Sequence, residues 1–247
     1  AGPAGLLEMK TTIPAPGHII HHQGGRISYW QREYQQSASD ENGISLADYI
    51  HAFHFFLMQA GVKDVLMIGC GGGNLATMLW RSGVDVTVVD IAAISFAIAR
   101  KYFAMPAGIS CHVADGIEWL KTHRRRHGAI VLDAFGPTGM PDVFMTDGFF
   151  RLAKSRLKPR GGLFLMNVIV DDDEDQTPDN MVRLMRRHWQ GVKLLDTDGW
   201  VDRNAVIAAG AVSKLRRPAV LMEPKSGARK LARQMDILDF RKIRRAR

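Results

Sequence analysis

Three glycines and a carboxylate in the first half of the chain have the types and spacing of a nucleoside-binding site. Residues 65–75 read V-L-M-I-G-C-G-G-G-N-L, and Asp90 follows 21 positions after the first glycine, at the end of V-T-V-V-D. Glycines let a ligand approach the backbone without Cβ clashes, and a helix that begins near Asn74 would direct free N–H groups at it. Asp90 can accept two hydrogen bonds from ribose hydroxyls. We therefore predict that Gly69, Gly71, Gly73 and Asp90 bind a nucleoside.

The spacing of the glycines favours one class of nucleoside ligand. A dinucleotide fingerprint, G-x-G-x-x-G, would require a glycine at position 74, where this chain has Asn74. The sequence therefore favours a mononucleoside ligand such as S-adenosylmethionine (AdoMet) over NAD. A purely structural glycine turn between a strand and a helix is the alternative, and Asp90 makes it the weaker one.

Two further carboxylates follow predicted strands. Asp115, with Gly116 beside it, follows the third strand, and Asp133 follows the fourth. Asp115 can accept a hydrogen bond from an adenine amino group, or it can cap the helix that starts after it. Asp133 has the position of a general base or an amine-binding group, and its structural alternative is a loop aspartate that bonds nearby N–H groups. In open α/β sheets ligands bind beyond the carboxyl ends of the strands, so these groups should share one cleft.

The elements that must position these residues alternate regularly along the chain. Apolar strands alternate with amphipathic helices, which indicates a doubly wound, mostly parallel sheet. Two later strands, if antiparallel, would complete seven strands. A helix before the first strand begins at Ser45 as its cap and ends at Gly61. The predicted strands are 65–68, 86–89, 110–113, 129–132, 162–169, 193–195 and 204–210, and the helices after the first strand are 74–82, 92–103, 116–122, 146–157 and 181–189.

The residues before and after this α/β unit differ from it in composition. Residues 1–8 resemble the remnant of an affinity tag. Residues 9–44 are predicted to be a short N-terminal β segment, with an extended lead-in over 9–24, a strand over 26–34 and a polar loop over 35–43. Residues 45–212 form the predicted AdoMet-binding catalytic domain, and residues 213–247 a basic C-terminal tail.

The tail carries the positive charge of the protein. It contains 12 Lys and Arg against three acidic residues, a balance of +9, whereas the rest of the chain has a balance of −1. Such a tail could bind an acidic partner or nucleic acid, or it could be a solvated helix face. Apolar Leu231, Met235 and Leu238 recur at helical spacing over 228–240, so we expect the tail to dock by one face.

The composition of the whole chain limits its class. With 247 residues, 46% of them hydrophobic, the chain can bury a full core. No run of 18 apolar residues predicts a membrane-spanning helix. The two cysteines give neither a disulfide framework nor a zinc site, and we expect a reducing compartment, the cytoplasm.

Five ordered motifs resemble the spermidine synthase family (polyamine aminopropyltransferases), a branch of the class I AdoMet-dependent methyltransferase fold. They are I-G-C-G-G-G-N, V-V-D-I, A-D-G-I-E-W-L, L-D-A-F-G-P-T-G-M-P and T-D-G-F-F-R-L-A-K-S-R-L-K-P-R-G-G-L, and the resemblance extends over residues 26–212. It implies a homodimer and an AdoMet-type cofactor. The cofactor-binding residues that it implies are Gln36, Gly69, Gly71, Gly73, Asp90, Ile91, Asp115, Gly116 and Asp133, with Asp133 also catalytic and Tyr49 near the amine channel.

The chain departs from the family pattern at three carboxylates. The family loop usually has an aspartate where this chain has Gly72, a second aspartate where it has Gly136, and an acid where it has His51. A diamine that leaves water needs anionic partners, and each charged hydrogen bond contributes about 1.5–3 kcal/mol. The loss of three carboxylates therefore predicts weak polyamine binding.

Three functional hypotheses follow. The first is methyl transfer from AdoMet to a small amine or hydroxyl acceptor, with Asp133 as the orienting group or base and Tyr49, His51 or His54 assisting. The second is aminopropyl transfer from decarboxylated AdoMet, with Asp40, Glu41 or Asp142 binding the amine. The third is a non-catalytic nucleoside-binding protein with an acidic partner. The pair His51 and His54 has no third ligand nearby in sequence, so we predict no metal site.

Overall fold

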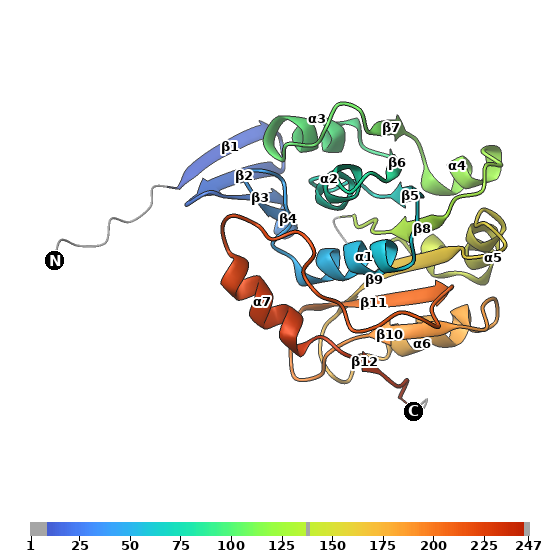
Figure 1. The fold of residues 1–247 in the computed structure, drawn as a ribbon. Coiled ribbons are helices and arrows are strands. Elements are labelled where there is room, and N and C mark those ends of the chain that lie inside the picture. The colour runs from blue at the N-terminus through green and yellow to red at the C-terminus, as the bar shows by residue number, and fades with distance from the viewer. Residues whose placement is uncertain (1–8, 137–138, 245–247) are drawn as a thin grey trace.

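A large mixed sheet forms the centre of the molecule, and a smaller antiparallel sheet lies beside it (Figure 1). The structure is a computed structural model, and it describes residues 9–136 and 139–244. The predicted tag remnant at residues 1–8 lies outside the described residues. No helix within the described part of the chain is long and apolar enough to cross a bilayer.

The large sheet has the strand order β12-β10-β11-β9-β8-β5-β6-β7. Strands β7, β6, β5, β8 and β9 run parallel, and β11, β10 and β12 continue the sheet with antiparallel pairs. The predicted doubly wound, mostly parallel sheet is therefore confirmed. The strands are β5 (Asp64–Ile68), β6 (Asp85–Asp90), β7 (Ser110–Val113), β8 (Ala129–Leu132), β9 (Leu163–Val170), β10 (Val192–Leu195), β11 (Arg203–Gly210) and β12 (Phe240–Arg241).

The predicted number of seven strands is wrong, because the basic tail supplies an eighth. The two-residue strand β12 pairs with β10 at the edge of the sheet. The Phe240 ring stacks on Phe56 with a centroid separation of 5.7 Å. So short a strand has no periodicity of its own, and it forms because tertiary contacts hold the tail there.

Helices cover both faces of the large sheet, which is why its strands are apolar throughout. Val65 and Met67 of β5 face a core shared with α1, α2, α3 and α7, whereas Leu66 and Ile68 face a core shared with α4, α5 and α6. The helices are α1 (Asp48–Gln59), α2 (Asn74–Arg81), α3 (Ala93–Tyr102), α4 (Gly116–Thr122), α5 (Asp147–Ser155), α6 (Thr177–Met185) and α7 (Ala228–Ile237), and a 3-10 turn, η1 (Asp142–Met145), precedes α5.

Two helix starts differ from the prediction. Helix α1 begins at Asp48 rather than at Ser45, because the Ser45 hydroxyl accepts a hydrogen bond from the Ala47 N–H and so closes a turn before the helix. Helix α6 begins at Thr177, four residues before the predicted start, and a proline in its first turn favours this beginning.

The N-terminal segment is a four-stranded antiparallel meander, whereas the sequence predicted only one strand there. Its strands are β1 (Lys10–Ala15), β2 (His18–Gln23), β3 (Arg26–Gln31) and β4 (Tyr34–Asp40), paired in chain order. The predicted lead-in over 9–24 therefore contains two strands. The predicted loop over 35–43 is mostly strand β4, a polar strand whose side chains do not alternate in burial. Gly24 and Gly25, both with positive φ, form the two-residue turn between β2 and β3.

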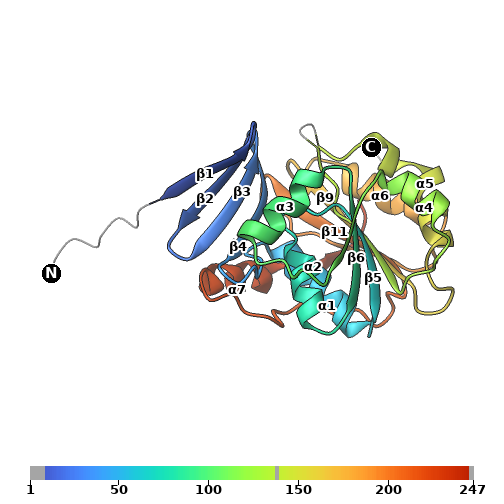
Figure 2. The ribbon, with the colours of Figure 1, turned by 90° about the horizontal axis from the view of Figure 1, so that it is seen from above.

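The small sheet packs beside α3 and is linked to the tail (Figure 2). Ile20, Ile27 and Tyr29 share a core with Ile98 and Phe103 from the α3 region. The Ser226 hydroxyl donates to the Gly25 carbonyl, so the start of the tail also touches this sheet. These contacts place β3 and β4 next to the carboxyl ends of β5 and β6.

The tail docks as its apolar spacing predicts. Leu231, Met235 and Leu238 are buried against the main core. Beyond α7, the Arg241 guanidinium donates to the buried carboxylates of Asp179 and Asp196. Part of the basic charge of the tail is therefore neutralised within the protein.

Candidate functional site

The glycine turn after β5 passes directly against the segment that carries Asp133. Gly69 has φ +100°, and a Cβ there would lie 2.1 Å from the Asp133 carbonyl oxygen. No other residue fits, because both the backbone conformation and the space require glycine. Packing within the protein therefore explains why position 69 is glycine, without any ligand. The close approach also brings the ends of β5 and β8 together.

Strand β4 covers the middle of the same turn. The Gly72 N–H donates to the Ser37 hydroxyl at 2.7 Å, and that hydroxyl donates to the Gln36 carbonyl at 2.6 Å. A Cβ at position 72 would lie 2.9 Å from the Cβ of Ser37. The structure therefore brings Gln36 to the turn, and it shows a physical reason for Gly72, because Ser37 occupies the space that a side chain would need. Ser37 was not among the predicted site residues.

Helix α2 begins at this turn without a side-chain cap. Its N-cap is Gly73, which has no side chain, and the Asn74 amide donates to the Gly43 carbonyl, so no side-chain cap is formed. The first N–H groups of α2 therefore keep their partial positive charge for a ligand.

Asp90 lies at the end of β6, next to the turn, as predicted. Its Oδ2 accepts the Cys70 N–H and its Oδ1 accepts the Ala92 N–H, each at 2.8 Å. Each oxygen of an ionised carboxylate retains a further lone pair, so the group can still accept hydroxyl donors. Burial raises the pKa of Asp90, and these hydrogen bonds lower it in part. Beside it, Ile91 is 75% exposed.

Asp115 caps helix α4. Its Oδ1 accepts the N–H groups of Ile117 and Glu118, so the helix-cap alternative is confirmed. The residue is exposed, and within the described residues no hydrogen bond to its Oδ2 is found. An additional contact with adenine stays a prediction. Gly116 packs on Ile68, where a Cβ would lie 2.5 Å from the Ile68 Cγ2 atom.

Asp133 is the centre of a small polar cluster. Its Oδ2 accepts the Tyr49 hydroxyl at 3.3 Å, and its Oδ1 accepts the Asn167 Nδ2 at 3.0 Å. No ion pair with Asp133 occurs among residues 9–136 and 139–244. Burial raises the pKa of Asp133 to about 6, although the two hydrogen bonds lower it. A carboxylate in this state suits proton transfer near neutral pH.

Asn167 was not among the site residues predicted from the sequence. It lies in β9, in the run L-F-L-M-N-V-I-V, and is 2% exposed. A polar residue within an otherwise apolar buried strand next to a predicted site is a signal that could have identified it.

The two histidines of α1 are engaged elsewhere. The His51 Nε2 atom lies 2.8 Å from the Ser45 carbonyl oxygen, and the His54 Nε2 atom lies 2.9 Å from the Ser82 hydroxyl. Burial lowers the pKa of both rings, that of His54 to about 4, so both are neutral at pH 7. No hydrogen bond found in the described part of the chain connects either ring to Asp133. Nor do the described residues contain a cluster of three or more His, Cys, Asp or Glu side chains that could hold a metal ion.

The acids considered as amine ligands are not grouped at Asp133. Asp40 is buried, and its oxygens accept the backbone N–H groups of Asn42, Ile44 and Lys225. Its role is therefore to hold the loop after β4 and the start of the tail. Glu41 and Asp142 are exposed.

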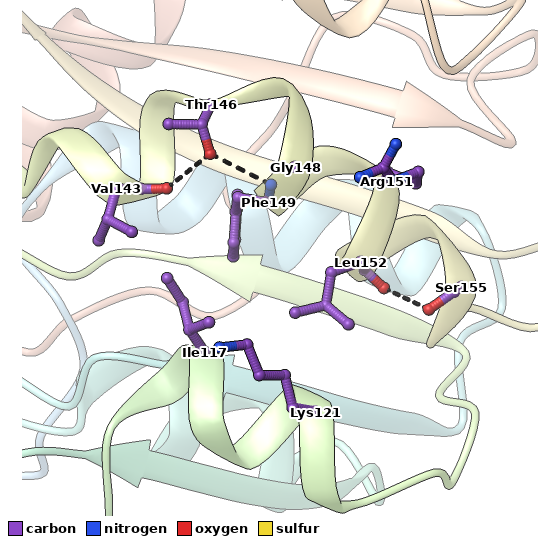
Figure 3. Close-up of a pocket in the computed structure, with 9 residues that line it drawn as sticks. All are labelled: Ile117, Lys121, Val143, Thr146, Gly148, Phe149, Arg151, Leu152 and Ser155. Atoms are coloured by element: carbon purple, nitrogen blue, oxygen red, sulfur yellow. Dashed lines mark hydrogen bonds between the residues drawn. The ribbon is translucent and has the colours of Figure 1, made fainter.

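A cavity of about 500 Å³ lies between α4 and the segment η1–α5 (Figure 3). Its lining is mainly apolar, with Lys121 and Arg151 as its charged members. None of the predicted site residues lines it, so it is separate from the site built around Asp133 and Asp90.

Comparisons with known proteins agree with this arrangement. Residues 50–171 match the spermine/spermidine synthase domain. The chain is 32% identical over 118 residues to a polyamine aminopropyltransferase of Chromobacterium violaceum, which covers 46% of this chain and 45% of that protein. It is 27% identical over 128 residues to an eEF1A lysine and N-terminal methyltransferase homolog of Drosophila melanogaster, which covers 47% of this chain and 19% of that protein. The chain thus spans less than half the length of these curated relatives.

Solved structures show the same fold. A probable spermidine synthase from Corynebacterium glutamicum has a TM-score of 0.72 at 15% identity, with 98% of this chain and 92% of that chain covered. Human methyltransferase-like protein 13, solved in complex with SAH, has a TM-score of 0.55 at 17% identity, with 77% and 88% covered. The fold is therefore that of the class I AdoMet-dependent methyltransferases. Within this fold, residues 50–171 are similar to the spermine/spermidine synthase domain, as the motifs of this chain predict.

Proposed function

We propose that this protein transfers an alkyl group from an adenosyl sulfonium compound to an amine acceptor, with Asp133 as the general base. The observation that supports the proposal most directly is how the Asp133 carboxylate is hydrogen-bonded and where its pKa lies. Its carboxylate is held by two neutral donors, Tyr49 and Asn167, without a cation, and it lies at the carboxyl end of β8 beside the glycine turn. Its pKa of about 6 leaves it ionised at pH 7 and still able to accept a proton.

The described residues fit the adenosyl group of such a donor. Asp90 would bind the ribose hydroxyls through its remaining lone pairs. Ile91 and Val113, which follow and end neighbouring strands, are 75% and 58% exposed and offer apolar surface for a base. Asp115, between β7 and α4, would contact the edge of the base. The uncapped start of α2 favours an anionic or polar end of the ligand.

The protein's contribution to the reaction is placement and removal of a proton. When bound, the sulfonium supplies an electrophilic carbon, whose bond to sulfur breaks as the acceptor nitrogen forms its new bond. Asp133 accepts the proton that the nitrogen loses, and Tyr49 and Asn167 hold the two carboxylate oxygens during that transfer. Orientation of the reactants and a base of suitable pKa are the two effects that such a site uses.

Two donors are supported by different observations. The curated polyamine aminopropyltransferases favour decarboxylated AdoMet, and thus aminopropyl transfer. The side chains favour AdoMet, and thus methyl transfer. Ser37 leaves no room for an acid at position 72, position 136 is glycine, and His51 is neutral and bonded to Ser45. The site therefore has fewer anions for a polycationic acceptor than the family pattern.

A donor competition assay tests the proposal. The purified protein is incubated with AdoMet or decarboxylated AdoMet and a panel of mono-, di- and polyamines, with hydroxyl analogues as controls, and products are identified by mass spectrometry. Transfer from either donor supports the class of reaction, and the preferred donor decides between methyl and aminopropyl transfer. Donor binding by calorimetry without transfer to any acceptor would contradict the proposal and favour a nucleoside-binding protein.

The pH profile gives a second test of the base. Because Asp133 must be ionised to accept a proton, kcat/KM should rise with pH through about 6 and level off above it. A profile that is flat from pH 5 to pH 8 would exclude Asp133 as the base.

The partners are predictions that need separate measurements. Exposed cations on α7, such as Arg229, Lys230 and Arg233, are the part of the tail that an acidic partner or nucleic acid would meet. Binding of this kind should weaken steeply with salt. The expected homodimer is tested by sedimentation, and the cytoplasmic location stays a prediction.

A further inference from the structure

Asn167 is a polar residue in a setting that otherwise consists of apolar side chains. In β9 it lies between Met166 and Val168, both buried, and on the neighbouring strand it faces Val206, which is also buried. Packing alone would be satisfied by an apolar residue of similar volume. A reason for the amide must therefore come from its hydrogen bonds.

The hydrogen bonds of Asn167 are incomplete. Its Nδ2 donates to the Asp133 Oδ1 at 3.0 Å, whereas its buried Oδ1 has no hydrogen-bond partner among the described residues. A buried acceptor without a partner lowers the stability of the fold. The opposite orientation of the amide would place its oxygen against a carboxylate oxygen, which is unfavourable because both are acceptors.

The single bond that Asn167 makes completes the coordination of Asp133. Tyr49 from α1 binds Oδ2, and Asn167 from β9 binds Oδ1, so donors from two different elements fix both oxygens. A carboxylate that leaves water without a cation needs such donors to remain ionised. Asn167 thus favours the charged form of Asp133 and its orientation, and an apolar residue could do neither.

We propose that Asn167 is a positioning residue that holds the Asp133 carboxylate ionised and oriented, at the expense of an unpartnered carbonyl group in the core. This inference rests on the proposed role of Asp133 as a base. It assigns to Asn167 an effect on catalysis and on the protonation of Asp133.

The test compares Asn167→Leu, which has similar volume and no donor, with Met166→Leu, a matched change at the adjacent buried position. Three quantities are measured for each: the midpoint of thermal unfolding, kcat/KM against pH, and the ¹³C-NMR titration of the Asp133 carboxyl, assigned with Asp133→Asn. In Asn167→Leu, the carboxyl pKa and the acidic limb of kcat/KM should both move up by about one unit. At pH 4, where the Asp133 carboxyl is protonated in both proteins, the unfolding midpoint should not fall; at pH 7 the higher carboxyl pKa lowers it. Met166→Leu should leave the pKa unchanged.

An unchanged carboxyl pKa in a folded Asn167→Leu variant would overturn the proposal, as would a lower unfolding midpoint with unchanged catalysis. If that variant fails to fold, Asn167→Ala is titrated in the same way, with the same upward shift expected. The NMR titration needs no turnover. A wild-type protein without transferase activity whose carboxyl pKa still responds to position 167 would therefore refute the proposed function and leave the role of Asn167 in place.

Discussion

The carboxylates at the edge of the sheet and the carboxylate of Asp133 have opposite kinds of hydrogen-bond donors. At the edge of the sheet, Asp179 and Asp196 are buried and bound by the Arg241 guanidinium at 2.7–3.0 Å, and Arg203 binds Asp196 at 2.7 Å. Burial by itself would raise the pKa of Asp179, but hydrogen bonds from Arg241 and Arg244 outweigh it and the pKa lies below its usual value. At the carboxyl end of β8, the donors to Asp133 among the described residues are the neutral Tyr49 and Asn167, and burial raises its pKa to about 6.

Under the proposed function, the difference separates a structural use of carboxylates from a chemical one. In the edge network, negative charge is matched by arginines, and this attaches the tail to α6 and β10. At Asp133, no cation among the described residues matches the negative charge, which costs stability but keeps a group that can take up a proton. Perturbed carboxylates without a cation are typical of functional sites.

The largest effect that would sharpen this comparison is expected from Asp133→Asn. Loss of a general base typically lowers turnover by about 10²- to 10⁴-fold, while the affinity for the donor should change little because the ribose contact lies at Asp90. Steady-state kinetics and calorimetry measure the two effects. Asp142→Asn, an exposed acid before α5, serves as the control, and equal losses in both variants would refute a special role for Asp133.

A large loss of stability is expected from Arg241→Ala. Removal of one partner from a buried ion pair costs about 3–5 kcal/mol, because Asp179 loses its guanidinium partner, although Asp196 keeps Arg203. Chemical denaturation measures the free energy of unfolding. Arg229→Ala, which truncates an exposed arginine of α7, should change it by less than about 0.5 kcal/mol. Equal effects of the two changes would show that the edge network is not what holds the tail.

Asp90→Ala should weaken donor binding. The lost hydrogen bonds to ribose predict about 1.5–3 kcal/mol of affinity, with the fold intact, although the variant also removes the acceptor of the Cys70 and Ala92 N–H groups. Calorimetric titration with AdoMet and a circular dichroism spectrum are the measurements. An unchanged affinity would place the ribose elsewhere.

The smallest expected effect is a gain of stability in Asp133→Asn. The folded pKa of about 6 lies above the usual value of 3.8, so the folded state holds the proton more tightly and the free energy of unfolding falls as pH rises from about 4 to 6. At pH 7 the variant should therefore be more stable by about 1–3 kcal/mol, with no difference near pH 4. A destabilised variant at pH 7 would mean that the carboxylate is structural after all.

The parallel sheet and the residues at the carboxyl ends of its strands follow from the sequence alone. Apolar runs that alternate with amphipathic helices leave few ways to cover both faces of a sheet, and the residues at strand ends then meet at one edge for geometric reasons. Gly69, Asp90, Asp115 and Asp133 could be placed by such reasoning, because each directly follows a strand in the chain.

The hydrogen bond of Asn167 to Asp133 and the cover of Ser37 over the glycine turn appear only in the folded structure, whereas Tyr49 was predicted near Asp133 through the family resemblance. Tyr49 and Asn167 lie 84 and 34 positions from Asp133, and Ser37 lies 35 positions from Gly72. No local pattern connects residues so far apart. The N-terminal meander and β12 escaped prediction for a related reason: short or polar strands carry little periodicity, and their pairing is stabilised by contacts with distant parts of the chain.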